Sequence, residues 1–356
     1  MSDARVKPSA RVQRLAARAL GRLPVWMQLR LSGQRQIVID DQRLDPQVQL
    51  LLAIHRRRRS YGLCRPSPAP ARARFRRDML ATAPLKTYVG TVRDLVIACG
   101  GGRLEARHYA PASAAANRDL LVYLHGGGFV LGDLDTHDEP CRIICRHAGT
   151  HVLSIAYRLA PEHPFPAALD DTLAALSWAQ ENGAGLVGAG CRVSIGGDSA
   201  GGNLATVAAG LSTRSGSAPA AQLLIYPATD AHTVHPSKEM FGDGFFLDRK
   251  DCDDFFYYYT EGTGVSDDDP RVSPLRASDL SGLPAALVVT AGFDVLRDEG
   301  DAYAAALSHA GTLTQLRRIP MLGHGFINMT GISRASLDAT IGVARAWRTM
   351  LDSLTA

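Results

Sequence analysis

Long apolar runs are missing from this sequence of 356 residues. No stretch approaches the roughly 18 consecutive apolar residues of a membrane-spanning helix, so no transmembrane helix is expected. The arginines of the N-terminus are spread through the first 22 residues, and no uninterrupted apolar run follows them, which argues against a secretory signal peptide. We therefore expect a cytoplasmic protein.

Cysteine is scarce and carries no metal-binding pattern. The six cysteines include no C-x-x-C pair. Cys141 and Cys145 would share one helix face, but no further ligand lies near them in the sequence. We expect reduced thiols, no metal and no cofactor.

Lysine is also rare, and the basic charge is almost all arginine, concentrated near the N-terminus. Residues 1–86 hold 19 basic and 5 acidic side chains, whereas the remaining 270 residues have a net charge of −10. The excess comes largely from Arg56 to Arg59 and from Arg72, Arg74, Arg76 and Arg77. Such a run can attract nucleic acid or anionic lipid. We favour a solvated helix face that docks on the acidic body, because no nucleic-acid motif accompanies it. The expected partner is a small molecule, and a homodimer is compatible with the sequence.

The order of patterns along the chain predicts an α/β fold. Helical patterns occupy part of residues 1–45, residues 46–63 after an Asp45-Pro46 cap, and residues 71–82 after a proline-rich link at 65–70. From Val89 onward strands alternate with helices, which indicates a mostly parallel sheet. The predicted strands are 88–98, 103–109, 120–124, 151–157, 191–196, 221–226, 285–290 and 314–319, and the predicted helices are near 138–149, 166–182, 200–212, 298–310 and 333–352.

Two segments fall outside this alternation. Residues 1–85 precede the catalytic domain, which we expect at 86–356, and residues 230–275 are inserted between the sixth and seventh strands. The insert carries the aromatic run Phe255 to Tyr259. These aromatics either line an apolar pocket over a nucleophile or fasten the segment to the body.

The most informative motif is G-x-S-x-G, formed by Gly197, Asp198, Ser199, Ala200 and Gly201. A β-branched stretch at 191–196 precedes it and a small, helix-competent stretch at 202–211 follows it. Strand, sharp turn and helix form the context of a nucleophile elbow. An ordinary glycine-rich turn is the alternative.

A glycine-rich loop, made by His125, Gly126, Gly127 and Gly128, lies 74 residues before Ser199 and directly follows the predicted strand at 120–124. Acyl transfer builds negative charge on a carbonyl oxygen, and preorganised N–H donors stabilise that charge. The loop therefore predicts an oxyanion hole.

A base and an acid follow in the order Asp294, His324. Histidine suits proton removal from serine because its pKa lies near neutrality, and a carboxylate orients the imidazole. Asp298 and Glu299 are rival acids, but Asp294 comes soonest after the strand, and the rivals fall at a helix start, where acids offset the helix dipole.

With these motifs the sequence resembles the hormone-sensitive-lipase family of α/β-hydrolases, in the bacterial esterase branch with HGGG and GDSAGG motifs. The resemblance extends from about Tyr88 to the C-terminus and includes residues 157–168. It implies an α/β-hydrolase fold whose eight-stranded sheet is flanked by helices under a helical cap built from both extra segments. It also implies that Ser199 is the nucleophile, Asp294 the acid and His324 the base, with the amides of Gly127, Gly128 and Ala200 as oxyanion donors.

The expected activity is hydrolysis of short- to medium-chain acyl esters through an acyl-enzyme. Amide hydrolysis, deacetylation of a specialised metabolite and acyl transfer would use the same residues. A non-catalytic binding protein on this fold is the remaining alternative, although such proteins typically lose the serine or the histidine.

Overall fold

Strands with almost entirely buried side chains form the centre of the molecule. The computed structural model describes residues 19, 23–58, 62–99, 102–113 and 118–355. Its main sheet has eight strands in the order β10-β9-β8-β7-β5-β6-β4-β3, and only the pairings of β4 with β6 and with β3 are antiparallel. Continuous burial along β5, β7, β8 and β9 fits a parallel sheet covered on both faces.

The eight strands expected from the sequence are confirmed, with ends that differ by a few residues. They are β3 (Thr91–Cys99), β4 (Gly102–Ala110), β5 (Asp119–Leu124), β6 (His151–Ala156), β7 (Arg192–Asp198), β8 (Ala221–Ile225), β9 (Ala285–Phe293) and β10 (Thr314–Gly323). The five helices expected between and after them are confirmed as α5 (Asp138–Ala148), α6 (Ala167–Val187), α7 (Ala200–Arg214), α10 (Arg297–His309) and α11 (Arg334–Ser353).

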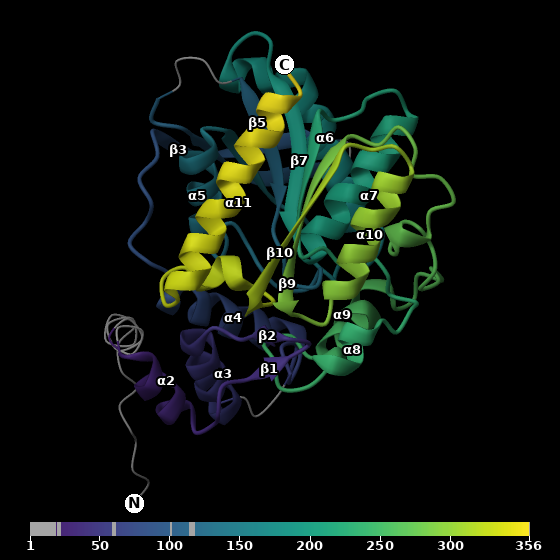
Figure 1. The fold of residues 1–356 in the computed structure, drawn as a ribbon. Helices are drawn as coiled ribbons and strands as arrows, with labels where there is room; N and C mark the ends of the chain where they lie inside the picture. The colour runs from purple at the N-terminus through teal and green to yellow at the C-terminus, as the bar shows by residue number, and fades with distance from the viewer. Residues whose placement is uncertain (1–18, 20–22, 59–61, 100–101, 114–117, 356) are drawn as a thin grey trace, which may run out of the picture.

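Helices cover both faces of the sheet (Figure 1). The helices α5 and α11 pack against each other on one face, and α6, α7 and α10 cover the other. Crossovers between parallel strands are right-handed, so the direction of the step along the sheet decides which face the connecting helix covers. The step from β5 to β6, through α5, runs toward one edge of the sheet, whereas the steps through α6, α7 and α10 run toward the other edge. Across the described ranges, none of the helices combines the length and apolarity needed to cross a bilayer.

The remaining elements belong to the two extra segments. The first contains α2 (Val25–Ser32), a small hairpin of β1 (Val38–Ile39) and β2 (Gln42–Arg43), α3 (Pro46–Arg58) and α4 (Pro68–Thr82). The second contains α8 (Pro236–Met240), α9 (Arg249–Thr260) and the 3-10 turn η1 (Pro274–Arg276), and a further 3-10 turn, η2 (Phe326–Met329), precedes α11.

The N-terminal segment required several corrections. The helix predicted at 71–82 starts at Pro68, because proline in the first helical turn loses no hydrogen bond. The helix predicted at 46–63 is described over Pro46–Arg58 and does not include Gly62 and Leu63, and Asp45 caps it by accepting the amide of Val48 at 3.0 Å. The hairpin was not predicted, and the helical pattern at 12–20 lies outside the described residues except for Ala19.

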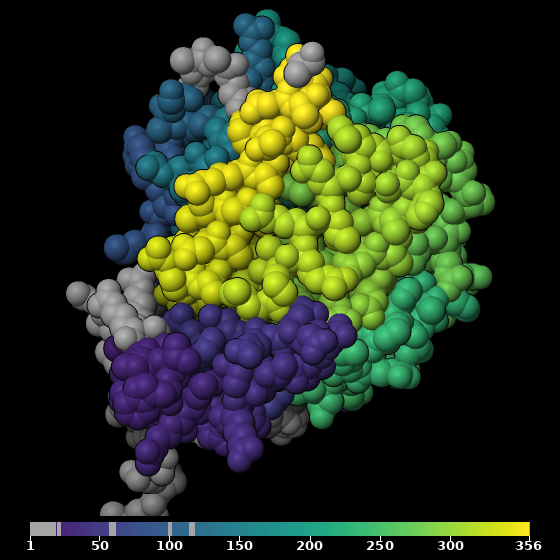
Figure 2. All heavy atoms as spheres, viewed as in Figure 1, coloured from purple at the N-terminus to yellow at the C-terminus, as the bar shows by residue number. Residues whose placement is uncertain are grey.

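Both extra segments gather at the end of the molecule toward which β9 and β10 point (Figure 1). Figure 2 shows the described N-terminal segment, in purple, against the C-terminal part of the body. The contact is specific: the amide of Asp45 donates to the carbonyl of Met321 at 2.9 Å, and Asp40 pairs with Arg297 at 2.8 Å. The segment therefore touches the start of α10 and the end of β10.

Two of the four arginines of α4 dock on acidic residues of the body, whereas Arg74 and Arg77, among the described residues, contact only the N-terminal segment itself. Arg72 pairs with Glu162 at 2.5 Å, and Arg76 pairs with Asp133 and Asp135. The side chains of Arg57 and Arg58 and all of Arg59 lie outside the described part of the chain.

Candidate active site

Ser199 stands at the junction of β7 and α7 with a backbone that few residues adopt. Its φ of 55° and ψ of −119° are unfavourable for a residue with a side chain. Its amide donates to the carbonyl of Ile225 at 2.9 Å, and its carbonyl accepts the amide of Asn203 at 3.0 Å. The turn therefore has the form of a nucleophile elbow, which lifts the hydroxyl above the strand end.

Gly197 and Gly201 are required by close packing. A Cβ on Gly197 would lie 2.3 Å from the carbonyl oxygen of Leu124, and one on Gly201 would lie 1.9 Å from it. Neither glycine has a positive φ, so the strain of the turn is concentrated at Ser199. Their missing side chains let the start of α7 approach the end of β5.

The structure brings Ser199, His324 and Asp294 together from three separate loops. The Nε2 atom of His324 lies 3.0 Å from the Ser199 Oγ, and its Nδ1 lies 2.8 Å from the Asp294 Oδ2. The carboxylate is buried, and its second oxygen accepts the amide of Leu296 at 2.9 Å. This arrangement suits a serine activated by a histidine that a carboxylate orients.

The two rival acids are engaged elsewhere. Asp298 accepts the amide of Ser237 at 2.8 Å and a hydrogen bond from Arg297 at 2.7 Å. Glu299 is buried in an ion pair with Lys238 at 3.0 Å. Both acids lie in the first turn of α10 and fasten the inserted segment to it.

The glycine-rich loop passes directly beside Ser199. Gly127 and Gly128 have φ values of 124° and 62°, which only glycine adopts readily. Among the described residues, no hydrogen bond uses the amide of Gly127 or Gly128 as donor, whereas the Gly127 carbonyl accepts the amide of Leu131 at 2.8 Å. Ala200 is the first residue of α7, where backbone amides have no partner within the helix.

Asp198 and Tyr157 hold the glycine-rich loop in place through hydrogen bonds to its first two residues. Asp198 accepts the amide of Gly126 at 2.9 Å and the hydroxyl of Tyr123 at 2.7 Å. His125 is buried, and its carbonyl accepts the hydroxyl of Tyr157 at 2.7 Å. Burial, together with the neighbouring His137, lowers the pKa of His125 to about 4, so its ring is neutral near pH 7.

Aromatic side chains of the inserted segment border the site, a position that the sequence pattern did not assign to particular residues. The ring of Phe255, from α9, packs on Gly128, where an added Cβ would lie 2.1 Å from its Cγ. Phe246 lies against Gly323, beside His324. The ring of Tyr226, which follows β8, lies with its centroid 4.6 Å from that of the His324 imidazole. The aromatic run Phe255 to Tyr259 drew attention to this segment in the sequence. Only the packing in the structure shows that Phe255 is the ring that lies against Gly128.

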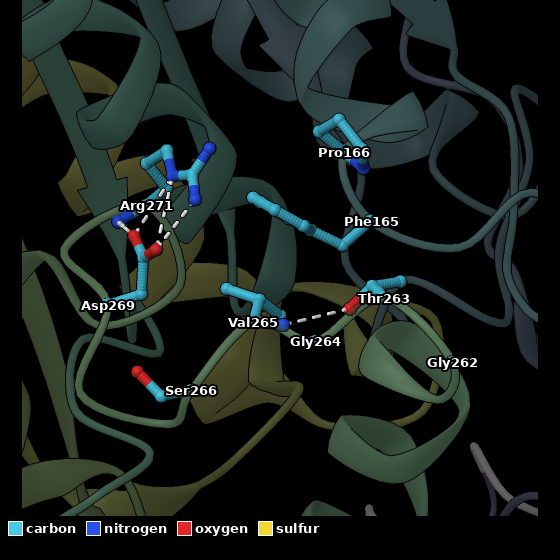
Figure 3. Close-up of a pocket in the computed structure, with 9 residues that line it drawn as sticks. All are labelled: Phe165, Pro166, Gly262, Thr263, Gly264, Val265, Ser266, Asp269 and Arg271. Carbon is cyan, nitrogen blue, oxygen red and sulfur yellow. Dashed lines mark hydrogen bonds and ion pairs between the residues drawn. The ribbon is translucent and has the colours of Figure 1, made fainter.

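Two cavities of about 530 Å³ each lie away from these residues. Figure 3 shows the first, lined by Phe165, Pro166, the loop 262–266, Asp269 and Arg271. Phe165 meets Tyr259 edge-on at 5.8 Å, and Tyr259 stacks on Phe129 of the glycine-rich loop at 3.8 Å. The rings of Phe165, Tyr259 and Phe129 lie between the cavity and the glycine-rich loop. The volume of this cavity is therefore not a measure of the space around Ser199. The second cavity lies between α2, the start of α3, β10 and α11.

Metal ligation is not indicated by the part of the chain that the structure describes. No group of three or more histidine, cysteine or acidic side chains is placed to hold an ion there. Cys141 and Cys145 lie on α5 as free, buried thiols, and burial raises the pKa of both well above its usual value.

Comparison with known proteins identifies a family model, relatives and a solved structure that this chain matches. A family model described as alpha/beta hydrolase fold matches residues 121–328. The chain is 44% identical to the carboxylic ester hydrolase LipN of Mycobacterium tuberculosis over 90% of this chain and 87% of that protein. It is 36% identical to an ethyl acetate hydrolase of Pseudomonas putida over 85% of this chain and 98% of that protein. Among solved structures, an ester hydrolase from the metagenome of Lake Arreo, in complex with a derivative of bipyridine phosphonate, aligns with a TM-score of 0.83 at 37% identity, covering 87% of this chain and 99% of its own.

Proposed function

Since this chain belongs to the α/β-hydrolase fold family, in its hormone-sensitive-lipase branch, we propose that Ser199, His324 and Asp294 carry out its ester hydrolysis. The protein is a carboxylic ester hydrolase, like the relatives that it matches over most of its length. The observation that supports the assignment of these residues is the position of His324, within hydrogen-bond distance of both the Ser199 hydroxyl and the Asp294 carboxylate.

In the first stage His324 removes the Ser199 proton as the oxygen attacks the ester carbonyl. Nε2 faces Oγ and is the atom that receives the proton, while Asp294 at Nδ1 keeps the ring in the required tautomer and stabilises the imidazolium. The collapsing tetrahedral intermediate expels the alcohol, which takes the proton back from Nε2. The acyl group remains on Ser199.

The oxyanion donors that we propose are the amides of Gly127, Gly128 and Ala200. Two come from the glycine-rich loop, where the described structure provides them with no other acceptor, and one from the start of α7. The amino end of α7 also places a positive dipole end near the developing charge.

The second stage repeats the chemistry with water. His324 takes a proton from water, which attacks the acyl-enzyme carbonyl, and the proton then passes to the Ser199 oxygen as the acid leaves. No step in this sequence calls for a metal or a redox cofactor.

Short- to medium-chain acyl esters are the substrates that we propose. Phe255 lies against Gly128 of the glycine-rich loop and Phe246 against Gly323, the neighbour of His324, so apolar rings border the loops that carry the site. The relative named for ethyl acetate supports a short acyl group.

We also propose that residues 1–85 and 230–275 form a cap. The described parts of both segments lie at the carboxyl ends of the strands, where Ser199, Asp294 and His324 are found (Figure 1). Arg65 of the first segment pairs with Asp254 of the second at 3.2 Å, so the two adjoin each other. A cytoplasmic location belongs to the same proposal and is supported by the free thiols at the five described cysteines.

The test is hydrolysis of p-nitrophenyl esters from acetate to decanoate, beside the matching anilides. We expect the shorter esters to give the highest kcat/KM and the anilides to react far more slowly. Ser199→Ala should abolish turnover and labelling by a fluorophosphonate probe without a change in melting temperature, because triad members act as a unit worth several orders of magnitude. Normal turnover by folded Ser199→Ala would disprove the mechanism.

A further inference from the structure

A buried histidine that has no part in the mechanism above lies among the loops that carry Ser199, Gly126 and His324. His137 precedes α5, and its side chain is 1% exposed. Its Nε2 lies 3.4 Å from the Oδ2 of Asp198 and 3.1 Å from the Nδ2 of Asn328. Its ring also stacks on His125 at 5.4 Å. One imidazole therefore contacts the nucleophile elbow, the glycine-rich loop and the turn η2 that follows His324.

Asp198 connects this histidine to the oxyanion loop. Its Oδ1 accepts the Gly126 amide and the Tyr123 hydroxyl, and its Oδ2 faces His137. Burial by itself raises the pKa of Asp198, but His137, Tyr123 and the Gly126 amide together hold that pKa below its usual value. Asp198 is therefore a buried carboxylate with two hydrogen-bond donors on Oδ1 and the His137 ring against Oδ2, which together favour one orientation of the group.

We propose that His137 is a positioning residue for ester hydrolysis: it fixes the Asp198 carboxylate, which in turn holds the Gly126 amide and so sets where the Gly127 and Gly128 amides point. The inference rests on the proposed function, because it assigns those two amides to the oxyanion.

The geometry explains why a residue that never touches substrate should matter. Gly126 is held at its amide by Asp198, and a Cβ there would lie 2.3 Å from the Asp198 Oδ2, so the loop and the carboxylate are packed together. Loss of His137 removes the imidazole that faces this carboxylate oxygen and leaves the Tyr226 hydroxyl as a remaining side-chain neighbour of Asp198. The carboxylate then turns toward other donors or draws in water, and the loop moves with it. Oxyanion donors act over distances of about 2.7–3.1 Å, so a small displacement weakens them.

The experiment compares three variants of the full chain. His137→Leu removes both ring nitrogens, whereas His137→Gln keeps an N–H near the position of Nε2. His151→Leu is the matched control, because His151 is also buried, its Nδ1 lies 3.0 Å from the Nε2 of His108, and it stands at the amino end of β6, away from Ser199. Each variant is assayed with p-nitrophenyl butyrate and with trifluoromethyl n-hexyl ketone, whose adduct with serine carries an oxyanion. Melting temperature is recorded for each.

We expect His137→Leu to lower kcat about 10- to 100-fold, less than the ~10²–10³-fold cost of deleting an oxyanion donor, with KM within about threefold. In His137→Leu the affinity for the ketone should fall in parallel with kcat/KM. His137→Gln should recover much of the lost kcat/KM and of the lost ketone affinity. His151→Leu should keep kcat within about twofold, even if its melting temperature falls. Unchanged kcat and ketone affinity in His137→Leu would overturn the inference, as would equal losses in the His151 control or no recovery by glutamine. If the wild-type protein did not hydrolyse the ester, the proposed function would fail instead.

Discussion

At Ser199 the backbone holds a conformation that costs free energy, about 1–3 kcal/mol for residues of this kind. The conformation persists because neighbours on both sides fix it: the Ile225 carbonyl binds the Ser199 amide, and Asn203 binds the carbonyl. The same fixed backbone places Oγ within reach of His324. Local strain and catalytic geometry are therefore one feature at this residue.

The acid of the triad provides the prediction at the residue scale. Asp294→Asn should lower kcat by about 10⁴, because the amide no longer holds His324 in the correct tautomer. The matched control is Asp298→Asn, four residues along the chain, where the carboxylate contacts Ser237 and Arg297 but not His324. It should keep kcat within about threefold. Steady-state hydrolysis of p-nitrophenyl acetate measures both, and a larger loss in Asp298→Asn would contradict our choice of acid.

At the scale of elements, α4 and α9 each contact the glycine-rich loop or the residues next to it. Arg72 of α4 donates to the carbonyls of Val130 and Ala160 at 2.7 and 2.6 Å. Phe255 of α9 covers Gly128. Both helices belong to the proposed cap, so the cap supports the catalytic loop as well as bordering the substrate.

Arg72 and Arg76 form a matched pair on α4. Both pair with acidic residues of the body, but Arg76 is partly exposed and contacts only carboxylates. Arg72→Ala should lower kcat about tenfold through loss of the two carbonyl contacts, whereas Arg76→Ala should change it less than twofold, since exposed ion pairs contribute little. The kinetics are to be measured at low and high salt. Equal effects of the two substitutions would show that only surface charge is involved.

Phe255 and Tyr257 form a second pair, on α9. Phe255 is buried against Gly128, whereas Tyr257 is 54% exposed. Phe255→Ala should raise the ratio of kcat/KM for decanoate over acetate esters by about tenfold, because it widens the space beside Ser199. Tyr257→Ala should leave that ratio unchanged. A constant ratio in Phe255→Ala would mean that the ring only fastens the cap.

At the scale of the whole molecule, the N-terminal segment binds parts of the chain far away in sequence. It contacts the start of α10 through Asp40 and Arg297, the end of β10 through Asp45, and the stretch before α11 through Gln47, whose side-chain amide donates to the Ile332 carbonyl. The segment is therefore fastened to the C-terminal part of the body at three places.

The pH dependence of stability also belongs to the whole molecule. Burial, with His151 and Arg93 nearby, lowers the pKa of His108 to about 4, and burial likewise lowers the pKa of His125 to about 4. The unfolded chain binds these protons near pH 6.5, so the stabilisation is complete above that pH and is lost as the pH falls toward 4. Each histidine should contribute about 1.4 kcal/mol per pH unit in this window.

Urea unfolding at pH 7, 6 and 5 measures this slope. His108→Gln should reduce the slope of the unfolding free energy against pH by the contribution of one histidine. The carboxylates contribute equally to the slope in the wild-type protein and in the variant, so the difference between the two proteins isolates His108. An identical slope in the variant would contradict the assignment.

The sequence alone determined the sheet, its helices and the residue types of the site. Strand periodicity and buried runs are local properties, and the motifs around Ser199, Gly127 and His324 each sit at a strand end, so their order along the chain was enough to predict that they meet. The structure brings them to the distances that the chemistry requires.

Only the tertiary structure decided which side chains surround and support them. Selection of Phe255 from five consecutive aromatics, of Arg72 from four arginines in α4, and of His137 from eleven histidines depends on contacts between segments far apart in sequence. The unpredicted hairpin at 38–43 is of the same kind, because each of its strands has two residues and its surroundings, rather than its own propensity, hold it in place. Local patterns fix what a segment can become, and packing across the whole chain fixes what each side chain touches.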